Sequence, residues 1–346
     1  MINTILPKST IGIIGGGQLG RMLAMSAKEM GYKIAMLDTS EDCCGRHFAD
    51  IFIHSAFNDL NNIEKLCKLS DVITFEFENI DVETLKALEK KYNFVQSAKS
   101  LAITQNRLYE KEFARSLNIP TVNYYKWNDE NIVIDKKCLM KTLTLGYDGK
   151  GQRIIESIDE IEENTIIEEL LNLDKEISVV AVKDRENIEI VAVVENEHRN
   201  NILFRSNIPA NISKETENEA IEYTKRILDN FDYYGVMTVE YFISDNKLIF
   251  NEIAPRVHNS GHITMQSANK SQFRAHIEAI CGLTVGKIYN KETTMYNILG
   301  QNEEYFINLK QRKQGYLHLY EKKARHNRKV GHMNFEGNVF LGDIIE

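Results

Sequence analysis

Residues 251–262 hold most of the side chains in this chain that could take part in catalysis. The segment reads Asn-Glu-Ile-Ala-Pro-Arg-Val-His-Asn-Ser-Gly-His, so it combines a carboxylate, an arginine, two histidines and three amide or hydroxyl groups. Residues 247–250 before it have an apolar pattern typical of a strand, and the polar groups therefore follow the end of a strand. A loop needs far fewer potential metal ligands, anion binders and hydrogen-bond donors merely to stay hydrated. We interpret this segment as a functional site.

Two glutamates are predicted to face each other across a hairpin. Glu240 lies in a strand pattern over residues 235–243, Glu252 lies in the next one over residues 247–253, and Asp245-Asn246 forms the link. Like charges in this position are destabilising unless a cation neutralises them. Magnesium binds through one or two carboxylates plus nucleotide phosphates, so it is the expected ion. The alternative is a pair of solvated glutamates on an edge hairpin.

A glycine-rich loop follows a strand that carries Lys141. The loop, residues 146–152, reads Gly-Tyr-Asp-Gly-Lys-Gly-Gln, and its backbone N–H groups could fold over phosphate oxygens. Lys141 could add a point charge to the same phosphates. Further along, the backbone after Glu168 could read an adenine edge and Glu176 could accept hydrogen bonds from ribose hydroxyls, although most such glutamates are simply exposed. These features predict a nucleotide site.

A second glycine turn lies near the N-terminus. Residues 15–20 read Gly-Gly-Gly-Gln-Leu-Gly, which satisfies G-x-G-x-x-G between a strand and a helix, and Asp38 ends the next strand. This arrangement is found in dinucleotide-binding folds, but the glycines require only a tight turn and close backbone approach. Because the rest of the chain indicates a different nucleotide, we do not favour a dinucleotide here.

The elements that must position these groups change character along the chain. Strand patterns at residues 10–14, 33–37, 50–53 and 72–75 alternate with helical patterns at 19–30, 60–69 and 82–92, the last with Asp81 as N-cap. This alternation predicts an α/β unit with a doubly wound parallel sheet. After residue 104, a helix at 107–117 and a charged helix at 213–230 accompany short strands, which predicts an α+β region. Two short strand patterns, 316–319 and 330–335, follow near the end.

Composition limits the function classes. At 346 residues the chain should form two or three domains, and 43% hydrophobic with 27% charged residues is ordinary for a globular protein. A net charge of −8 argues against a nucleic-acid partner. A basic run near the C-terminus could still bind a small anion or could be a solvated face. It contains Lys322, Lys323, Arg325, Arg328 and Lys329.

The cysteines and the apolar runs suggest where the protein acts. The five cysteines are odd in number and show no CxxC spacing, which argues against a disulfide framework or zinc site and favours a reducing compartment. No signal peptide and no apolar run of about 20 residues is recognisable, so we expect no membrane partner. A cytoplasmic location is predicted.

Taken together and in this order, the motifs resemble those of the ATP-grasp ligases. Within that superfamily the chain is similar to the N5-carboxyaminoimidazole ribonucleotide synthetases, a resemblance that spans nearly its whole length. The segments that carry it are residues 12–22 (GIIGGGQLGRM), 74–79 (TFEFEN), 146–152 (GYDGKGQ), 251–262 (NEIAPRVHNSGH), 271–273 (SQF) and 328–332 (RKVGH).

The resemblance implies an architecture and a reaction. The domains would be an N-terminal Rossmann-like pre-ATP-grasp domain (1–103), an ATP-grasp domain (104–292, with a lid at about 120–175) and a small β-rich C-terminal segment (293–346). The enzyme would convert 5-aminoimidazole ribonucleotide, bicarbonate and ATP to the N5-carboxylated ribonucleotide, ADP and phosphate by way of carboxyphosphate, in purine (IMP) biosynthesis. Family members are commonly homodimers, which predicts a homodimer here.

The resemblance also implies roles for individual residues. Glu240 and Glu252 would hold magnesium, and the catalytic residues would be Asp148, Lys150, Arg256 and His258. The ATP-binding residues would be Arg107, Lys141, Gly146, Tyr147, Asp148, Gly149, Lys150, Gly151, Gln152, Glu168, Glu169, Leu170, Leu171, Glu176, His198, Asn251 and Glu252. The ribonucleotide would be bound by Glu76, Tyr147, Asn259, Ser260, Arg328, Lys329, Gly17, Gln18 and Leu19, with backbone N–H groups of the turn at residues 15–20 available to its phosphate.

Three alternatives remain open at this point. A formate-dependent phosphoribosylglycinamide transformylase, or another ATP-grasp ligase that joins a carboxylate to an amine, would use similar machinery. The transformylase should carry a serine-rich turn in place of Gly-Tyr-Asp and Asp-Thr in place of Asn259-Ser260. A nucleotide-binding regulator without activity should lack one of the two metal carboxylates, yet both are present. A nicotinamide-dependent dehydrogenase finds no support after residue 100.

Overall fold

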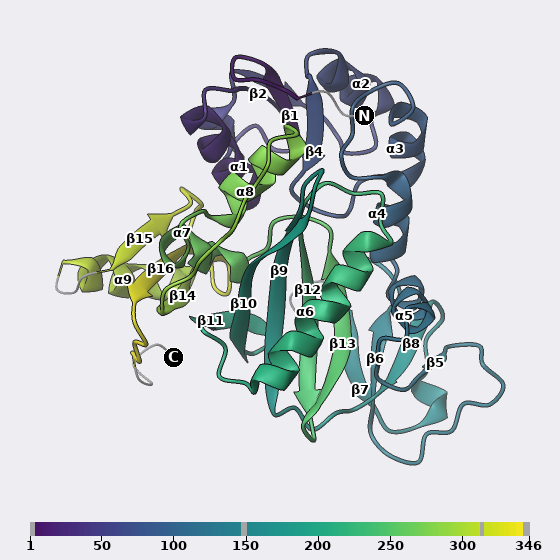
Figure 1. Cartoon of the computed structure of the whole chain (residues 1–346). Helices are drawn as coiled ribbons and strands as arrows, with labels where there is room; N and C mark the ends of the chain where they lie inside the picture. The colour runs from purple at the N-terminus through teal and green to yellow at the C-terminus, as the bar shows by residue number, and fades with distance from the viewer. Residues whose placement is uncertain (1–3, 147–150, 312–314, 342–346) are drawn as a thin grey trace.

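The computed structural model describes residues 4–146, 151–311 and 315–341, which form three sheets with flanking helices (Figure 1). The N-terminal sheet contains β1 (Thr10–Ile14), β2 (Lys33–Asp38), β3 (Ile51–His54) and β4 (Val72–Phe75). All its neighbouring strands are parallel, in the order β3-β2-β1-β4. The predicted doubly wound parallel sheet is therefore confirmed.

Helices cover both faces of this sheet, because the side chains of each strand point to two different cores, one on each face. Ile11 and Ile13 pack with α1 (Gln18–Glu29), whereas Ile14 and Phe75 pack with α2 (Leu60–Lys68), α3 (Val82–Leu88) and α4 (Ala98–Thr104). Strands buried on both faces are typical of parallel sheets. The Asp81 side chain accepts a hydrogen bond from Thr84 N, which confirms it as the N-cap of α3.

The central sheet has eight strands in the order β13-β12-β9-β10-β11-β14-β16-β15. Their bounds are β9 (Lys175–Lys183), β10 (Ile188–Arg199), β11 (Ile202–Ile208), β12 (Gly235–Ser244), β13 (Lys247–Ala254), β14 (Thr293–Leu299), β15 (Tyr316–Leu319) and β16 (Lys329–Glu336). The two C-terminal strands that the sequence predicts thus extend this sheet through β14. The boundaries expected after residues 103 and 292 stay predictions.

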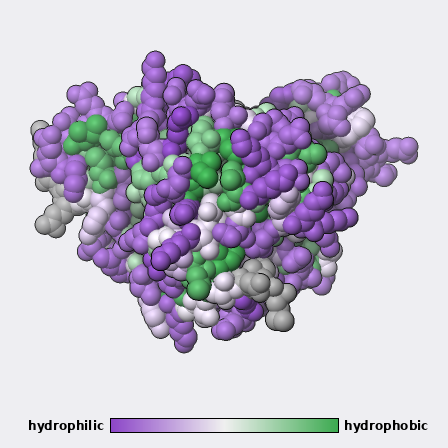
Figure 2. Space-filling model, turned by 90° about the horizontal axis from the view of Figure 1, so that it is seen from above, coloured by the Kyte–Doolittle hydropathy of each residue, from purple (hydrophilic) through white to green (hydrophobic). Residues whose placement is uncertain are grey.

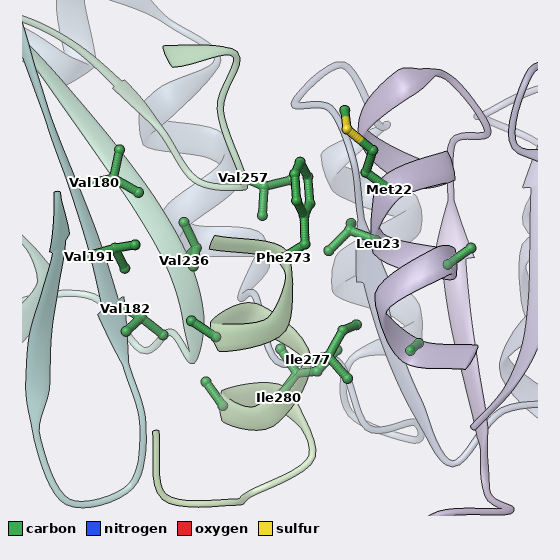
Figure 3. Close-up of a cluster of buried hydrophobic side chains, with 14 of the residues drawn as sticks. Met22, Leu23, Val180, Val182, Val191, Val236, Val257, Phe273, Ile277 and Ile280 are labelled. Atoms are coloured by element: carbon green, nitrogen blue, oxygen red, sulfur yellow. The ribbon is translucent and has the colours of Figure 1, made fainter. Parts of the chain in front are cut away.

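Two helices pack on opposite faces of the central sheet. On one face, α6 (Lys214–Asp229) packs on alternate residues of β9 such as Val179. On the other, Val180 and Val182 contact α8 (Gln272–Ile280), which also reaches α1 of the N-terminal unit. Figure 3 shows Phe273 of α8 between Val257 and Leu23 of α1. This shared core fixes the N-terminal unit against the central sheet.

A third, antiparallel sheet lies beside α5 (Arg107–Ser116) in the order β5-β8-β6-β7. Its strands are β5 (Tyr124–Lys126), β6 (Cys138–Thr142), β7 (Gln152–Ile155) and β8 (Thr165–Glu169). The remaining helices are the short α7 (Thr264–Ser267) and α9 (Glu303–Lys310), with 3-10 turns at Arg46–Phe48, Ile158–Glu160, Ser260–Ile263 and Gly300–Asn302. The sheet supplies part of the lining of a cavity described below.

The surface is mainly polar. Figure 2 shows hydrophilic residues over most of the face seen from above, with smaller hydrophobic areas between them. Within the described ranges, no helix combines the length and apolarity that crossing a bilayer requires. All five cysteines are free thiols, as their number and spacing predict.

Candidate active site

Two adjoining cavities lie where the three sheets meet. The first, of about 430 Å³, is lined by the N-terminal glycine turn, residues 76–79, α5 and the end of β13. The second, of about 280 Å³, lies over the central sheet and is lined by Lys141 of β6 and Glu176 of β9. Five residues line both cavities: Arg107, Glu252, His258, Asn259 and Lys329. Molecules bound in the two cavities would therefore meet at this shared wall.

The two predicted metal carboxylates face each other as expected. Glu240 of β12 pairs in register with Glu252 of β13, and the turn residues Asp245 and Asn246 both have positive φ, 50° and 59°. Burial and the Glu252 charge raise the pKa of Glu240 to about 8. Little positive charge lies near the pair: Arg107 is 3.6 Å from Glu252, and the group 3.5 Å from Glu240 is the His258 imidazole, whose pKa is lowered by burial. Carboxylate oxygens under mutual repulsion fit a magnesium ion.

Arg256 is fixed by a carboxylate from another part of the chain. It donates to both oxygens of Glu78, 178 residues earlier, and both residues line the first cavity. Burial alone would lower the pKa of Arg256, but the charge and hydrogen bonds of Glu78, together with the charges of Glu252 and Glu76, outweigh burial and raise that pKa. The guanidinium is thus a permanently charged group at the rim of the first cavity.

His258, Asn259 and Ser260 have different surroundings although they are consecutive. Ser260 is fully buried and its hydroxyl lies 2.9 Å from His258 Nδ1, so it orients the histidine instead of facing a cavity. Burial and the Arg256 charge lower the pKa of His258 well below its usual value, so its imidazole is neutral. Both amide atoms of Asn259 are buried without a hydrogen-bond partner in the described structure, and the residue lines both cavities. Asn259 is therefore suited to a ligand at the shared wall.

The N-terminal glycine turn is already satisfied by two acids. Asp38 accepts from Gly16 N at 2.6 Å, and Glu76 accepts from the backbone N–H groups of Gly17 and Gly20. Burial raises the pKa of Glu76, and those two hydrogen bonds oppose the rise. Protein carboxylates occupy the N–H groups of Gly16, Gly17 and Gly20, so these three groups do not support the expected phosphate role, which stays a prediction for the rest of the turn. Asp38 also accepts from Ser40 N at 2.8 Å, so both of its oxygens bind the protein's own backbone.

The predicted nucleotide residues separate into two groups. Arg107, Lys141, Gln152, Glu176, His198, Asn251 and Glu252 line the second cavity. In contrast, Glu168 is 3% exposed behind Lys141, and the Glu169 side chain binds Lys136 and Asn123. Leu170 and Leu171 lie just beyond, with the Leu170 side chain exposed. Among the described residues, none of Glu168 to Leu171 thus lines either cavity.

The glycine-rich loop is described only in part. Gly146 lines the first cavity. Gly151 has φ +74°, and a Cβ added to it would lie only 2.5 Å from Thr142 Oγ1, so glycine is required there. Tyr147, Asp148, Gly149 and Lys150 lie outside the described residues. The catalytic roles expected of Asp148 and Lys150 stay predictions.

The C-terminal basic run folds against the N-terminal unit. Lys322 donates to Gln18, and Arg21 of α1 pairs with Glu321 at 2.9 Å. Lys329 lines both cavities, and Gly17, Gln18 and Leu19 line the first. Arg328 donates to Lys323 O, and no cavity-lining role is seen for it in the described structure.

Sequence reasoning missed three residues at or behind the site: Glu78, Glu110 and Lys111. Glu110 lines the first cavity and accepts from Ile253 N at 2.8 Å, which ties α5 to the strand of Glu252. Burial and Glu252 raise the pKa of Glu110 well above its usual value. Helical spacing could have identified it, because residues three and four positions after Arg107 share its face of the helix.

Three family models match successive parts of the chain. They are the ribonucleotide synthetase preATP-grasp domain (residues 8–105), the ATP-grasp domain (112–273) and the phosphoribosylaminoimidazole carboxylase C-terminal domain (293–339). The N5-carboxyaminoimidazole ribonucleotide synthase of Staphylococcus aureus strain N315 is 40% identical over 94% of this chain and 92% of its own length. That of Staphylococcus saprophyticus is 38% identical over 98% and 94%.

Solved structures agree with these relatives. The Staphylococcus aureus N5-carboxyaminoimidazole synthetase complexed with ADP has a TM-score of 0.92 at 38% identity, with 97% of this chain and 95% of that chain covered. The Aspergillus clavatus N5-carboxyaminoimidazole synthase, in complex with ADP and 5-aminoimidazole ribonucleotide, has a TM-score of 0.87 at 25% identity over 95% and 94%. The chain belongs to the N5-carboxyaminoimidazole ribonucleotide synthase family of ATP-grasp ligases.

Proposed function

We propose that this protein is an ATP-dependent ligase that carboxylates 5-aminoimidazole ribonucleotide with bicarbonate, in purine biosynthesis. The products are N5-carboxyaminoimidazole ribonucleotide, ADP and phosphate. The observation that carries the proposal is the shared wall, where Arg107, Glu252, His258, Asn259 and Lys329 line both cavities. A reaction between a nucleotide in one cavity and an acceptor in the other requires such a common boundary. Family membership supplies the identity of the two substrates.

The second cavity is the proposed ATP site. Lys141 and Arg107 provide positive charge for the phosphates, while Glu176 and His198, 3.0 Å apart, lie at the same cavity. Glu240 and Glu252 would hold magnesium, which neutralises phosphoryl charge when bound. Within the described residues no cluster of three or more histidine, cysteine or acidic side chains could hold a metal by itself.

The first cavity is the proposed site of the ribonucleotide. Bicarbonate is a poor electrophile, so one of its oxygens attacks the γ-phosphorus of ATP, ADP leaves, and carboxyphosphate forms. The amine then attacks the carboxyl carbon, phosphate leaves, and the amine gives up a proton. Arg256, held by Glu78, faces the negative charge of the carboxyl group, and the unpartnered amide of Asn259 orients it. Neutral His258, held by Ser260, is a candidate proton acceptor.

ADP release measures the proposed reaction. It should require ATP and bicarbonate and should rise when aminoimidazole ribonucleotide is added, with the carboxylated product formed in equal amount. The transformylase alternative predicts ADP release with formate and glycinamide ribonucleotide instead. A protein that releases no ADP with either pair would contradict the proposal.

Asp148 carries a separate prediction. By family resemblance it orients the amine or accepts its proton, so Asp148→Asn should keep part of the ATP hydrolysis and lose the carboxylated product, because carboxyphosphate then decays in water. Measuring ADP and product together distinguishes the outcomes. Parallel loss of both would indicate a structural or ATP-binding role instead.

Two broader expectations accompany the proposal. A cytoplasmic location is inferred from a role in purine biosynthesis, and a homodimer from the habit of the family. Cell fractionation and light scattering of the purified protein test them, and a monomer at micromolar concentration would contradict the second.

A further inference from the structure

The carboxylate of Glu168 is shared by two lysines that come from different elements. Lys141 Nζ of β6 lies 2.7 Å from Oε2, and Lys111 Nζ of α5 lies 3.0 Å from Oε1. All three side chains are buried, with 2% of Lys111, 4% of Lys141 and 3% of Glu168 exposed. The group joins α5, which carries Arg107, to the sheet that carries Lys141.

This buried group has one positive charge more than negative charge. An ammonium without a full counter-charge is costly in a buried place, so the cluster favours the arrival of an anion. Only one of its lysines can meet that anion, because Lys141 lines the second cavity and Lys111 is absent from the described residues that line either cavity. Any effect of Lys111 on a ligand in the cavity must therefore pass through Glu168.

We infer that Lys111 is a positioning residue for the nucleotide: by holding one oxygen of Glu168, it prevents that carboxylate from turning fully to Lys141 and leaves the Lys141 ammonium available to phosphate. The inference rests on the proposed function, since it assumes that the second cavity takes ATP. It adds to that function a residue outside the cavity, Lys111, which limits how strongly Lys141 is paired with Glu168.

The charges around Lys141 support this view. Burial lowers the pKa of Lys141, the Glu168 charge opposes this, and Lys111 and Arg107 lower it further. For Glu168, burial is outweighed by Lys141 and Lys111, which lower its pKa to about 2, so it stays ionised. Without Lys111 the full carboxylate would pair with Lys141 alone and the pKa of Lys141 would rise.

The test compares Lys111→Met and Lys111→Arg with the wild-type chain. In Lys111→Met the remaining Lys141–Glu168 pair is neutral, so the protein should fold with an unchanged or higher melting temperature. Its Kd for magnesium ADP and its KM for ATP should both rise about tenfold, while the KM for the ribonucleotide changes less than about twofold, a tenfold change being about 1.4 kcal/mol. Lys111→Arg keeps the charge and should restore most of the affinity.

Two further measurements separate positioning from general damage. The loss of ADP affinity at alkaline pH, where Lys141 deprotonates, should move to higher pH in Lys111→Met, because the lowering charge is gone. Lys126→Met is the matched control, since Lys126 also pairs with a carboxylate of α5, Glu112 at 2.9 Å, but at the exposed surface. It should bind ADP as the wild type does.

Three results would contradict the role inferred for Lys111. Wild-type ADP affinity in Lys111→Met would overturn the inference, as would equal losses for both substrates together with a lower melting temperature. An unshifted alkaline loss would also overturn it. If the wild-type chain itself bound no magnesium ADP, the proposed function would fail, and the inference with it.

Discussion

At the scale of single residues, neighbours in the sequence have distinct physical roles. His258, Asn259 and Ser260 are consecutive, yet one is a neutral imidazole, one an amide without a partner, and one a buried hydroxyl that holds the imidazole. The sequence identifies such residues by type and spacing, because a dense polar segment after a strand is unusual. Their different roles depend on tertiary contacts, such as those of His258 with Gln272 and Arg256. Residue spacing in the sequence does not show these contacts.

His198 gives a prediction at this scale. Burial alone would lower the pKa of His198, but the hydrogen bond and charge of Glu176 at 3.0 Å raise it above 6.5. Glu176→Gln should remove that support, so the pKa of His198 should fall below 6.5. A titration of the ring by NMR measures it, with Glu197→Gln as control, since Glu197 pairs with Arg199 and Arg205 of the same hairpin.

The sign of the stability effect follows from the raised pKa. The pair contributes to the free energy of unfolding fully below the unfolded pKa of about 6.5, and loses that contribution as pH rises through the higher folded pKa. Wild type and Glu176→Gln should therefore differ most in acid and converge in alkali. A difference that grew as pH rose would contradict the role given to the Glu176–His198 pair.

At the scale of elements, the sequence was informative where each element has one clear pattern. The hairpin of β12 and β13 was predictable from two apolar runs and Asp245-Asn246, and with it the facing glutamates. α8 was missed because it has only nine residues and most of them are buried between the central sheet and α1, and so short a run cannot be told from a buried strand by periodicity. β11 and β14 were missed as well, and they join the C-terminal strands to the central sheet.

The hairpin carries the magnesium prediction. Replacing Glu252 by glutamine removes one of the two facing charges, and turnover should fall by roughly a hundredfold or more, because neutralisation of phosphoryl charge by a metal is worth several kcal/mol. Excess magnesium should recover part of the loss. Glu195→Gln is the control, since Glu195 pairs with Lys175 elsewhere on the sheet. Near-normal turnover of Glu252→Gln at low magnesium would refute the metal assignment.

At the scale of the whole molecule, the site depends on contacts between distant parts of the chain. Arg256 reaches Glu78 across 178 residues, and Lys322 reaches Gln18 across 304. Periodicity and motifs indicate which residues have chemistry and which elements hold them, but they give no distance between elements. Only the family resemblance predicted that these separate motifs form one site. The carboxylates that occupy the glycine turn and the lysine behind Glu168 became visible only in three dimensions.

The C-terminal segment gives the last prediction, because its place on the N-terminal unit brings Lys329 to the site. A ribonucleotide phosphate needs local positive charge in a chain of net charge −8, and the Arg21–Glu321 and Lys322–Gln18 contacts hold the basic run against α1. Lys329→Ala should raise the KM for aminoimidazole ribonucleotide about tenfold and change that for ATP by less than about twofold, since a phosphate handle contributes mainly uniform binding. Lys323→Ala, an exposed change in the same run, is the control and should leave both constants unaltered. Steady-state kinetics with each substrate varied in turn measure the two constants. Because Lys329 lines both cavities, the informative opposite result is a selective rise in the KM for ATP, which would assign this lysine to the nucleotide.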